Sequence, residues 1–420
     1  MNTLEIISIL VATAALFGWL SSRVLRLPLT IGTMLLTVLA TFSLAIVGRA
    51  VPTVHAWAEH LTHRIDFQSL IMHGMLPLLL FAGAFLLDVE ELAREKLPVA
   101  VLAVGGTIIS VFAVAGLMML LSGTGARWMD YLIFGALISP TDPIAVLELL
   151  RRVGIPKALE AQLAGESLFN DGVGAVLFLT MIEIAQGHAP SAGHVAGFLL
   201  LEAGGAVALG VLGAWLVSRL MCLVDAYQVE ILLTLALALG GYVLADTWNL
   251  SAPLEAVVAG IALRHFNRKQ PKGRIADEQV DEFWTLLDEV QNSLLFVLLG
   301  LEAMAVRLNE TTLRAGASAI FSVNLVRFAV VALCLAIVRV CDKSRLRSIK
   351  TLTWGGLRGG LSIALALSVP ATLGGVQTAP WIFGATYMIV VFSIIIQGGS
   401  LQFALARKGR HVAPAEVHTS

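Results

Sequence analysis

The chain has 420 residues, a net charge of −1, and far more apolar than charged side chains. Its residues are 57% hydrophobic and 14% charged, whereas an average soluble domain is about 25% charged. A soluble protein of this length needs more polar cover on its outer surface, so the composition excludes an ordinary soluble fold and predicts lipid as the solvent. A net charge near zero gives no sign of a nucleic-acid partner.

The first apolar run covers residues 4–22 and has two possible interpretations. A secretory signal peptide carries basic residues before its apolar core. Here Arg23 and Arg26 follow the run instead of preceding it. The pattern therefore predicts a first membrane span that is retained.

Twelve more apolar runs follow along the chain. A span needs roughly 20 mostly apolar residues, and the ninth run is the shortest. The resulting map predicts an all-α polytopic membrane protein with about 13 transmembrane helices. The predicted spans are 4–22, 29–48, 69–88, 98–121, 130–150, 163–185, 194–218, 229–246, 252–264, 284–304, 315–339, 351–370 and 380–403.

The basic residues predict how these spans are oriented. If the N-terminus lies outside, strict alternation places 21 of the 28 lysines and arginines on the inner side and 5 on the outer side. The remaining two lie within spans. Because basic residues gather on the cytoplasmic side of membrane proteins, this split predicts an outside N-terminus and a cytoplasmic C-terminus.

The fifth span contains the segment "ISPTDPIAV", in which two prolines enclose a polar pair. Pro140 and Pro143 remove two backbone donors and cannot continue a regular helix. Ser139, Thr141 and Asp142 sit at that point. A simple proline kink is the alternative interpretation. We expect a broken helix, whose freed carbonyls and half-helix ends suit cation coordination.

The sixth span contains "GESLFNDGVGAV", with four polar residues within six positions. Ser167 and Asp171 are i,i+4 neighbours, and Asn170 follows Ser167 at i,i+3, so the three share one helix face. Glu166 points partly elsewhere. A carboxylate, a hydroxyl and an amide oxygen are ligands for a hard monovalent cation. The alternative is a purely structural polar cluster.

The twelfth span contains "TWGGLRGGLSIALALSVP", where four glycines flank Arg358 and predict a second interrupted helix. An arginine at this depth needs a partner, and Glu166 is the candidate because its charge is otherwise unexplained. Arg327 in the eleventh span is a second buried base, for which the possible partners are Glu148, Glu302 or another acid.

The two breaks also carry topological information. Spans five and twelve are seven apart, so they cross the membrane in opposite directions. We therefore expect one transmembrane domain, residues 1–403, built from two inverted six-helix repeats. Repeat one covers about 1–185, a linking helix about 194–218, and repeat two about 229–403, followed by a short cytoplasmic tail at 404–420.

The motifs "SPTDP", "GESLFNDGVG" and "WGGLRGGLS", in this order, resemble the cation:proton antiporter-1 family, the NhaP- and NHE-type exchangers. The resemblance covers nearly the whole chain, and "ESLFND" is its most specific part. It implies the NhaA/NhaP-like fold of two inverted six-helix repeats with crossed broken helices. It also implies a homodimer, elevator-like alternating access and electroneutral exchange.

The resemblance further implies roles for single residues. Asp171 would be the essential carboxylate that carries a cation or a proton, and Glu166 with Arg358 would form a structural ion pair. The implied cation-binding residues are Asp171, Asn170, Ser167, Thr141 and Asp142. Of these, Na⁺ itself would sit at Asp171, Ser167, Asp142 and the Thr141 carbonyl.

The chain departs from the family pattern in the third span. Several members carry a glutamate in an "LLFEG"-like run, whereas this chain has "LLLFAGAFLLD" with Ala82 at that place. The departure leaves three outcomes open: weaker binding, a water in that position, or a different choice of cation.

The expected function is exchange of Na⁺, with Li⁺ as a further substrate, for H⁺ across the bacterial inner membrane, in pH and Na⁺ homeostasis. No cofactor and no enzymatic activity are expected, because the acids at the helix breaks include no HExxH-type ligand pair that would indicate an intramembrane protease. The alternatives are a K⁺/H⁺ antiporter of the same family, a cation channel, and a structural membrane protein.

Overall fold

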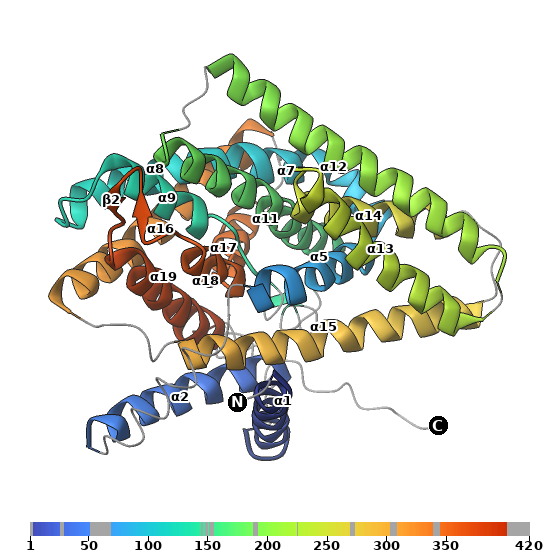
Figure 1. Cartoon of the computed structure of the whole chain (residues 1–420), viewed down its shortest axis with the longest axis horizontal. Helices are drawn as coiled ribbons and strands as arrows, with labels where there is room; N and C mark the ends of the chain where they lie inside the picture. Colours follow the sequence, from blue (N-terminus) through green and yellow to red (C-terminus); the bar gives the residue numbers. More distant parts are fainter. Residues whose placement is uncertain are drawn as a thin grey trace, which may run out of the picture.

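The computed structural model describes residues 3–25, 29–50, 69–143, 146–147, 150, 155–187, 192–224, 226–268, 274–302, 309–338 and 345–400. Within these ranges the chain is mostly helical (Figure 1). Seven of the described helices are long and apolar enough to cross a membrane, and three shorter apolar helices accompany them. The chain is therefore a multi-pass membrane protein.

Helices occur in each of the thirteen predicted ranges, while the number of complete crossings stays a prediction. In the first half the elements are α1 (Thr3–Leu20), η1 (Ser21–Leu25), α2 (Leu29–Ala50), η2 (Leu70–Met75), α5 (Leu76–Phe85), α6 (Val89–Arg94), α7 (Lys96–Ala100), η3 (Val101–Gly106), α8 (Thr107–Leu121), α9 (Trp128–Ile138) and α11 (Lys157–Ala185). In the second half they are α12 (Ala192–Met221), α13 (Tyr227–Thr247), α14 (Ala252–Arg268), α15 (Arg274–Glu302), α16 (Glu310–Ile337), α17 (Arg345–Gly355), α18 (Gly360–Leu367), β1 (Thr372–Leu373), β2 (Val376–Gln377), α19 (Trp381–Phe392) and η5 (Ser393–Gly398).

The expectation of an all-α chain needs one correction. A short antiparallel hairpin, β1 paired with β2, joins α18 to α19. Its turn residues Gly374 and Gly375 have φ values of +59° and +76°, which side chains rarely adopt and which two-residue hairpin turns require. The hairpin falls between two predicted spans, so it leaves the helical architecture unchanged.

Two helices, α6 and α16, begin with a side-chain cap. Asp88 precedes α6 and accepts hydrogen bonds from the N–H groups of Glu90 and Glu91. Partial burial acts to raise the pKa of Asp88, but these hydrogen bonds, together with the positive charges of Arg268 and Lys157, hold the pKa below its ordinary value. Asn309 caps α16 in the same way, accepting from the Thr312 N–H at 2.8 Å.

The contacts between helices divide them into two groups. In the first, called the core bundle here, α8, α9, α11 and α16–α19 pack together with η3. In the second, called the scaffold bundle here, α1, α2, α5 and α12–α15 pack together. In the view of Figure 1, α1 and α2 lie beneath α15, and both contact it.

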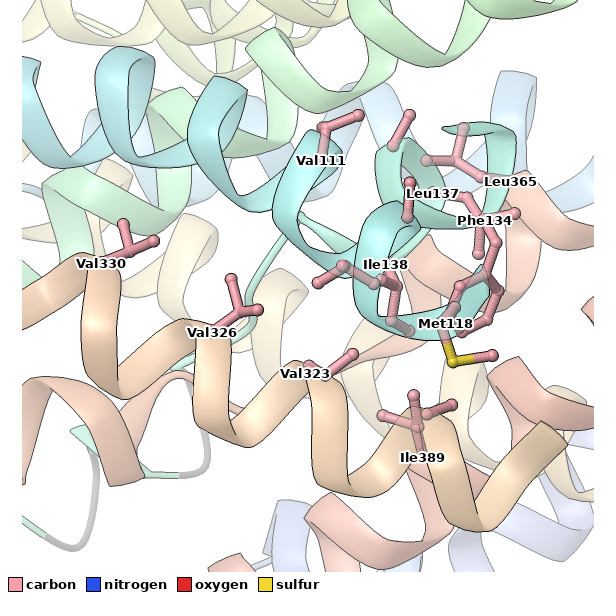
Figure 2. Packing of buried hydrophobic residues seen from close by; sticks show 14 of the residues in the cluster. Val111, Met118, Phe134, Leu137, Ile138, Val323, Val326, Val330, Leu365 and Ile389 are labelled. Atoms are coloured by element: carbon pink, nitrogen blue, oxygen red, sulfur yellow. The ribbon is translucent and has the colours of Figure 1, made fainter. Parts of the chain in front are cut away.

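The largest hydrophobic cluster holds the core bundle together. Figure 2 shows Val323, Val326 and Val330 of α16 facing the side chains of α8 and α9, with Ile389 of α19 beside them. Small residues let the backbones approach closely. A Cβ placed on Gly135 of α9 would lie 2.4 Å from a backbone oxygen of α8, so only glycine fits there.

Large apolar side chains also lie on the outside of the bundles. Leu120 at the end of α8 is 79% exposed and Leu201 on α12 is 75% exposed. Trp19, Leu232 and Phe321 are exposed as well. A soluble monomer does not carry so many exposed large apolar residues, whereas a lipid-facing surface requires them.

Both predicted helix interruptions are confirmed. In the first half of the chain, α9 ends at Ile138, and residues 139–143 are not helical. In the second half, α17 ends at Gly355 and α18 begins only at Gly360. The two breaks touch, because the N–H of Asp142 donates to the Leu357 carbonyl at 2.8 Å. The inverted relation between the two halves stays a prediction.

Candidate functional site

A cavity of about 370 Å³ lies where the core and scaffold bundles meet. From the core bundle, the first break and α11 contribute Thr141, Asp142, Ser167 and Asp171 to its wall. The start of α18 adds further core-bundle residues, and α5 and α15 line the cavity from the scaffold bundle. Four of the five predicted cation-binding residues therefore line one cavity.

The polar face of α11 meets the broken segment as its spacing predicts. The Ser167 hydroxyl donates to the Thr141 carbonyl, so two of the predicted ligand groups are in direct contact. Among the described residues, no hydrogen bond reaches Oδ1 of Asp171, although that atom is buried. A buried carboxylate oxygen without a protein partner is suited to a proton or a cation.

The fifth predicted residue, Asn170, has a different position. It is buried outside the cavity wall, and its amide nitrogen donates to Glu166 Oε1 at 2.9 Å and to Thr141 Oγ1 at 2.8 Å. Its Oδ1 accepts from the Thr141 N–H at 3.3 Å. Asn170 thus ties the broken segment to α11, and its direct contact with the cation stays a prediction.

The predicted ion pair between Glu166 and Arg358 is wrong. Glu166 instead pairs with Arg327 of α16, whose Nη1 and Nη2 each lie 2.6 Å from one carboxylate oxygen. The two residues are 1% and 8% exposed. A bidentate geometry is the strongest form of this contact, and Arg327 also donates to the Leu352 carbonyl at 3.1 Å.

The physical reason for the correction lies in the first break. Because the last carbonyls of a helix have no partner within the helix, the end of α9 leaves acceptors in the membrane. Nη1 of Arg358 donates to the Ser139 carbonyl at 2.6 Å and to the Pro140 carbonyl at 2.9 Å. The guanidinium therefore caps the negative end of α9 and needs no carboxylate.

Asp142 has the complementary position at the start of α18. A Cβ placed on Gly359 would lie 2.5 Å from the carboxylate oxygen Oδ2 of Asp142, so that carboxylate rests against the backbone just before Gly360. The N-terminus of a helix favours negative charge. The end of α9 therefore faces the positive charge of Arg358, and the start of α18 faces the negative charge of Asp142.

The glycines around Arg358 are needed for this crossing. A Cβ on Gly356 would lie 2.7 Å from Nη2 of Arg327, and one on Gly360 would lie 2.4 Å from a methyl group of Leu295. On the facing helix, a Cβ on Gly174 would lie 2.7 Å from the ring of Pro140. The sequence pattern indicated close backbone approach, and the structure identifies the groups that approach.

The structure shows where Ala82, the departure from the family pattern, lies. Ala82 is fully buried in a cluster with Phe81, Phe85 and Trp284. From this turn of α5, Gly83 lines the cavity and Ala82 does not. Here α5 supplies no carboxylate to the cavity wall.

Other polar residues of the cavity wall went unnoticed in the sequence. They are Thr285, Asp288, Glu289 and Asn292 of α15, and Ser362 of α18. The signal was present, because Asp288, Glu289 and Asn292 lie inside an apolar predicted span. Within the described part of the chain, no cluster of three or more His, Cys, Asp or Glu residues forms a metal site.

Comparison with known proteins adds family relationships to this geometry. The family model described as "Sodium/hydrogen exchanger, transmembrane" matches residues 11–407. The chain is 38% identical over 409 residues to the Na(+)/H(+) antiporter NhaP of Pseudomonas aeruginosa, and the match covers 95% of both chains. It is 32% identical to the Na(+)/H(+) antiporter NhaG of Bacillus atrophaeus, covering 87% of this chain and 70% of that protein.

Among solved structures, the fold is similar to that of the sodium proton antiporter MjNhaP1 from Methanocaldococcus jannaschii at pH 8. The TM-score is 0.71 at 19% sequence identity, and the match covers 95% of this chain and all of that one. At this identity the similarity establishes the shared fold.

Proposed function

This chain belongs to the transmembrane sodium/hydrogen exchanger family, and from that premise we propose that it exchanges Na⁺ for H⁺ across a membrane. The carrier is Asp171, which holds either the cation or the proton. Ser167, the Thr141 carbonyl and Asp142 complete the cation shell, and Asn170 holds the broken segment in position.

One observation carries the proposal: of the two core-bundle carboxylates in this cavity wall, Asp142 and Asp171, Asp171 is the one whose charge has no structural task. Glu166 is compensated by Arg327, and Arg358 caps the end of α9. Asp142 rests at the start of α18. Oδ1 of Asp171, by contrast, is buried in the cavity wall without a hydrogen bond from the described residues.

The mechanism is competition for this single carboxylate. Na⁺ and H⁺ exclude each other at Asp171, so each leaves the site with the same net charge. If Asp142 remains ionised throughout, one proton returns for each Na⁺ and the exchange is electroneutral. Li⁺, a smaller hard cation, is a further substrate of the same oxygen ligands.

Alternating access follows from the position of the cavity between two bundles. Movement of the core bundle along the scaffold bundle carries Asp171 with the two breaks and leaves α5 and α15 behind. We propose an elevator-like movement of this kind, two inverted repeats, a homodimer, and a bacterial inner-membrane location with the N-terminus outside and the C-terminus, residues 404–420, in the cytoplasm. The physiological role is pH and Na⁺ homeostasis, and no cofactor is required.

A K⁺/H⁺ exchanger is the second candidate, and Ala82 is the observation in its favour. Loss of a carboxylate from the third span weakens the field at the cation, and a weak field discriminates less well against the larger ion. The cavity volume of about 370 Å³ admits K⁺ as readily as Na⁺.

The test is ion flux in proteoliposomes. Proton movement driven by Na⁺, Li⁺ and K⁺ gradients ranks the three cations, and we expect Na⁺ to drive exchange. A membrane potential of 100 mV acts on a moved net charge with about 2.3 kcal/mol. Clamping the potential with K⁺ and valinomycin should therefore leave the initial Na⁺-driven rate unchanged. A rate that follows the potential would show that a second group carries an extra proton.

A further inference from the structure

The cavity has a second polar wall that the exchange mechanism above does not use. It consists of the α15 residues Thr285, Asp288, Glu289 and Asn292, together with Ser362 of α18. These residues line the same cavity as Asp171 and Asp142. A cation that reaches Asp171 through this cavity passes them.

The α15 residues of this wall differ in exposure. Asp288 and Asn292 are i,i+4 neighbours, and so are Thr285 and Glu289, so each pair stacks along the helix. Thr285 and Glu289 are exposed, Asp288 is half-buried, and Asn292 is only 1% exposed. The cavity wall on α15 therefore holds both exposed and buried polar groups.

The hydrogen bonding of Asn292 leaves its amide oxygen available as an acceptor. Its amide nitrogen donates to the Asp288 carbonyl one turn earlier, at 2.9 Å. No donor among the described residues contacts its Oδ1. The side chain therefore keeps one carbonyl-type oxygen for a ligand in the cavity.

Ser362 gives an independent observation at the same wall. Its side chain is 0% exposed, and its hydroxyl has no hydrogen-bond partner among the described residues. A buried hydroxyl is normally satisfied, so an unsatisfied one that lines a cavity points to a ligand. Ser362 lies in the first turn of α18, which contacts α15 through Gly360 and Leu295.

We propose that Asn292 and Ser362 bind the transported cation directly, and that the carboxylate of Asp288 draws the cation toward them. The proposal rests on the proposed function and deepens it, because it adds ligands to the same cavity. With Ala82 at the third span, these oxygens supply part of the coordination that α5 does not. Asn292 belongs to the scaffold bundle, so it binds the cation only while the core bundle stands against this part of α15.

The experiment compares six variants in proteoliposomes, four of which are two test variants and their matched controls. Asn292→Leu removes an oxygen with little change in volume, and Ser362→Ala removes the hydroxyl. Their matched controls are Ser293→Ala on α15 and Ser368→Ala at the end of α18. The hydroxyls of both controls already donate to backbone carbonyls one turn earlier, and neither residue lines the cavity.

Loss of one direct ligand should raise the KM for Na⁺ by about tenfold. The maximal rate at saturating Na⁺ should stay within about twofold, because Asp171 is intact. Ser362→Thr, which keeps the hydroxyl, should restore most of the affinity. Asp288→Asn should raise KM at low ionic strength more than at high ionic strength, because salt screens an attracting charge. Both controls should match the unmodified protein.

Two results overturn the proposal. One is an unchanged KM for Na⁺ in both Asn292→Leu and Ser362→Ala. The other is an equal rise in KM for the controls, which would indicate a general effect on the helices. If one variant does not fold, the KM of the other decides.

A binding measurement separates this proposal from the proposed function. Titration of the purified protein with NaCl, LiCl and KCl, against choline chloride at equal ionic strength, gives a cation-dependent rise in melting temperature. If the unmodified protein shows no exchange but Na⁺ still raises its melting temperature, the proposed function fails. The further inference then stands if Asn292→Leu and Ser362→Ala weaken that effect, and falls if they do not.

Discussion

The contact between Glu166 and Arg327 allows a quantitative test of how the site is held together. Glu166→Gln removes the charge of the acid, and Arg327→Gln removes that of the base. Each single change strands the opposite charge in a buried position, since the residues are 1% and 8% exposed. The double variant leaves no unpaired charge at this position, because both charges are removed.

Breaking one partner of a buried pair costs about 3–5 kcal/mol. The upper part of that range applies here, because both guanidinium nitrogens lie 2.6 Å from carboxylate oxygens. The double variant should lose less than the sum of the single changes, with a coupling of about 1–3 kcal/mol. The pair of Glu166 with Arg358 should couple less, because Arg358 donates to backbone carbonyls.

The assay is the free energy of unfolding in detergent or bicelles, for the unmodified protein and for both double-variant cycles. Arg327→Lys provides a control that keeps the charge and loses the bidentate geometry. Its free energy of unfolding should lie between that of the unmodified protein and that of Arg327→Gln. Additive losses for Glu166 and Arg327, or a stronger coupling for Glu166 and Arg358, would refute this account of the site.

Two further predictions test a glycine and a helix cap. Gly359→Ala should abolish or sharply weaken Na⁺-driven flux in a folded protein, because its Cβ would displace Asp142. The control Gly116→Ala, whose Cβ meets open space, should transport normally. A fully active Gly359→Ala protein would show that Asp142 is not part of the site. Asp88→Ala should cost about 0.5–2 kcal/mol at neutral pH. Because the cap holds the pKa of Asp88 below its ordinary value, its contribution is complete above that ordinary value and is lost as the pH falls through the lowered pKa. The free energy of unfolding of the unmodified protein, measured from pH 7 to pH 3, should show this loss. Asp88→Asn, which keeps a cap without a charge, should not show it. The same dependence of unfolding free energy on pH in both proteins would contradict the assignment of Asp88 as a charged cap.

The architecture was accessible from the sequence because lipid imposes simple rules on it. Runs of about 20 apolar residues mark spans, and prolines or clustered glycines inside them mark breaks. Ser167, Thr141, Asp142 and Asp171 could be grouped for the same reason, since polar residues at membrane depth gather where the helices are interrupted.

The partner of Glu166 could not be derived in the same way. Arg327 and Arg358 both required compensation. Glu166 was assigned to Arg358, and the partner of Arg327 was left open among Glu148, Glu302 or another acid. The choice depends on carbonyls freed at the end of α9, which exist only once the two breaks cross. A backbone acceptor has no sequence signature, so Arg358 was assigned the side-chain partner that belongs to Arg327.

The residues of α15 were missed for another reason. Asp288 and Asn292 stand in an apolar run and could be read as the polar face of a scaffold helix. Their position in the wall of the cavity that Asp171 also lines depends on how the core and scaffold bundles meet, and no local pattern encodes that contact.

The most direct test of the central claim is Na⁺-driven proton flux through Asp171→Asn in proteoliposomes. The substitution keeps the size of the side chain and removes the group that exchanges cation for proton. Asp246→Asn, at an exposed position of α13 outside the cavity wall, is the matched control. We predict no coupled flux for Asp171→Asn and an unchanged rate for Asp246→Asn. Substantial Na⁺/H⁺ exchange by a folded Asp171→Asn protein would contradict the account.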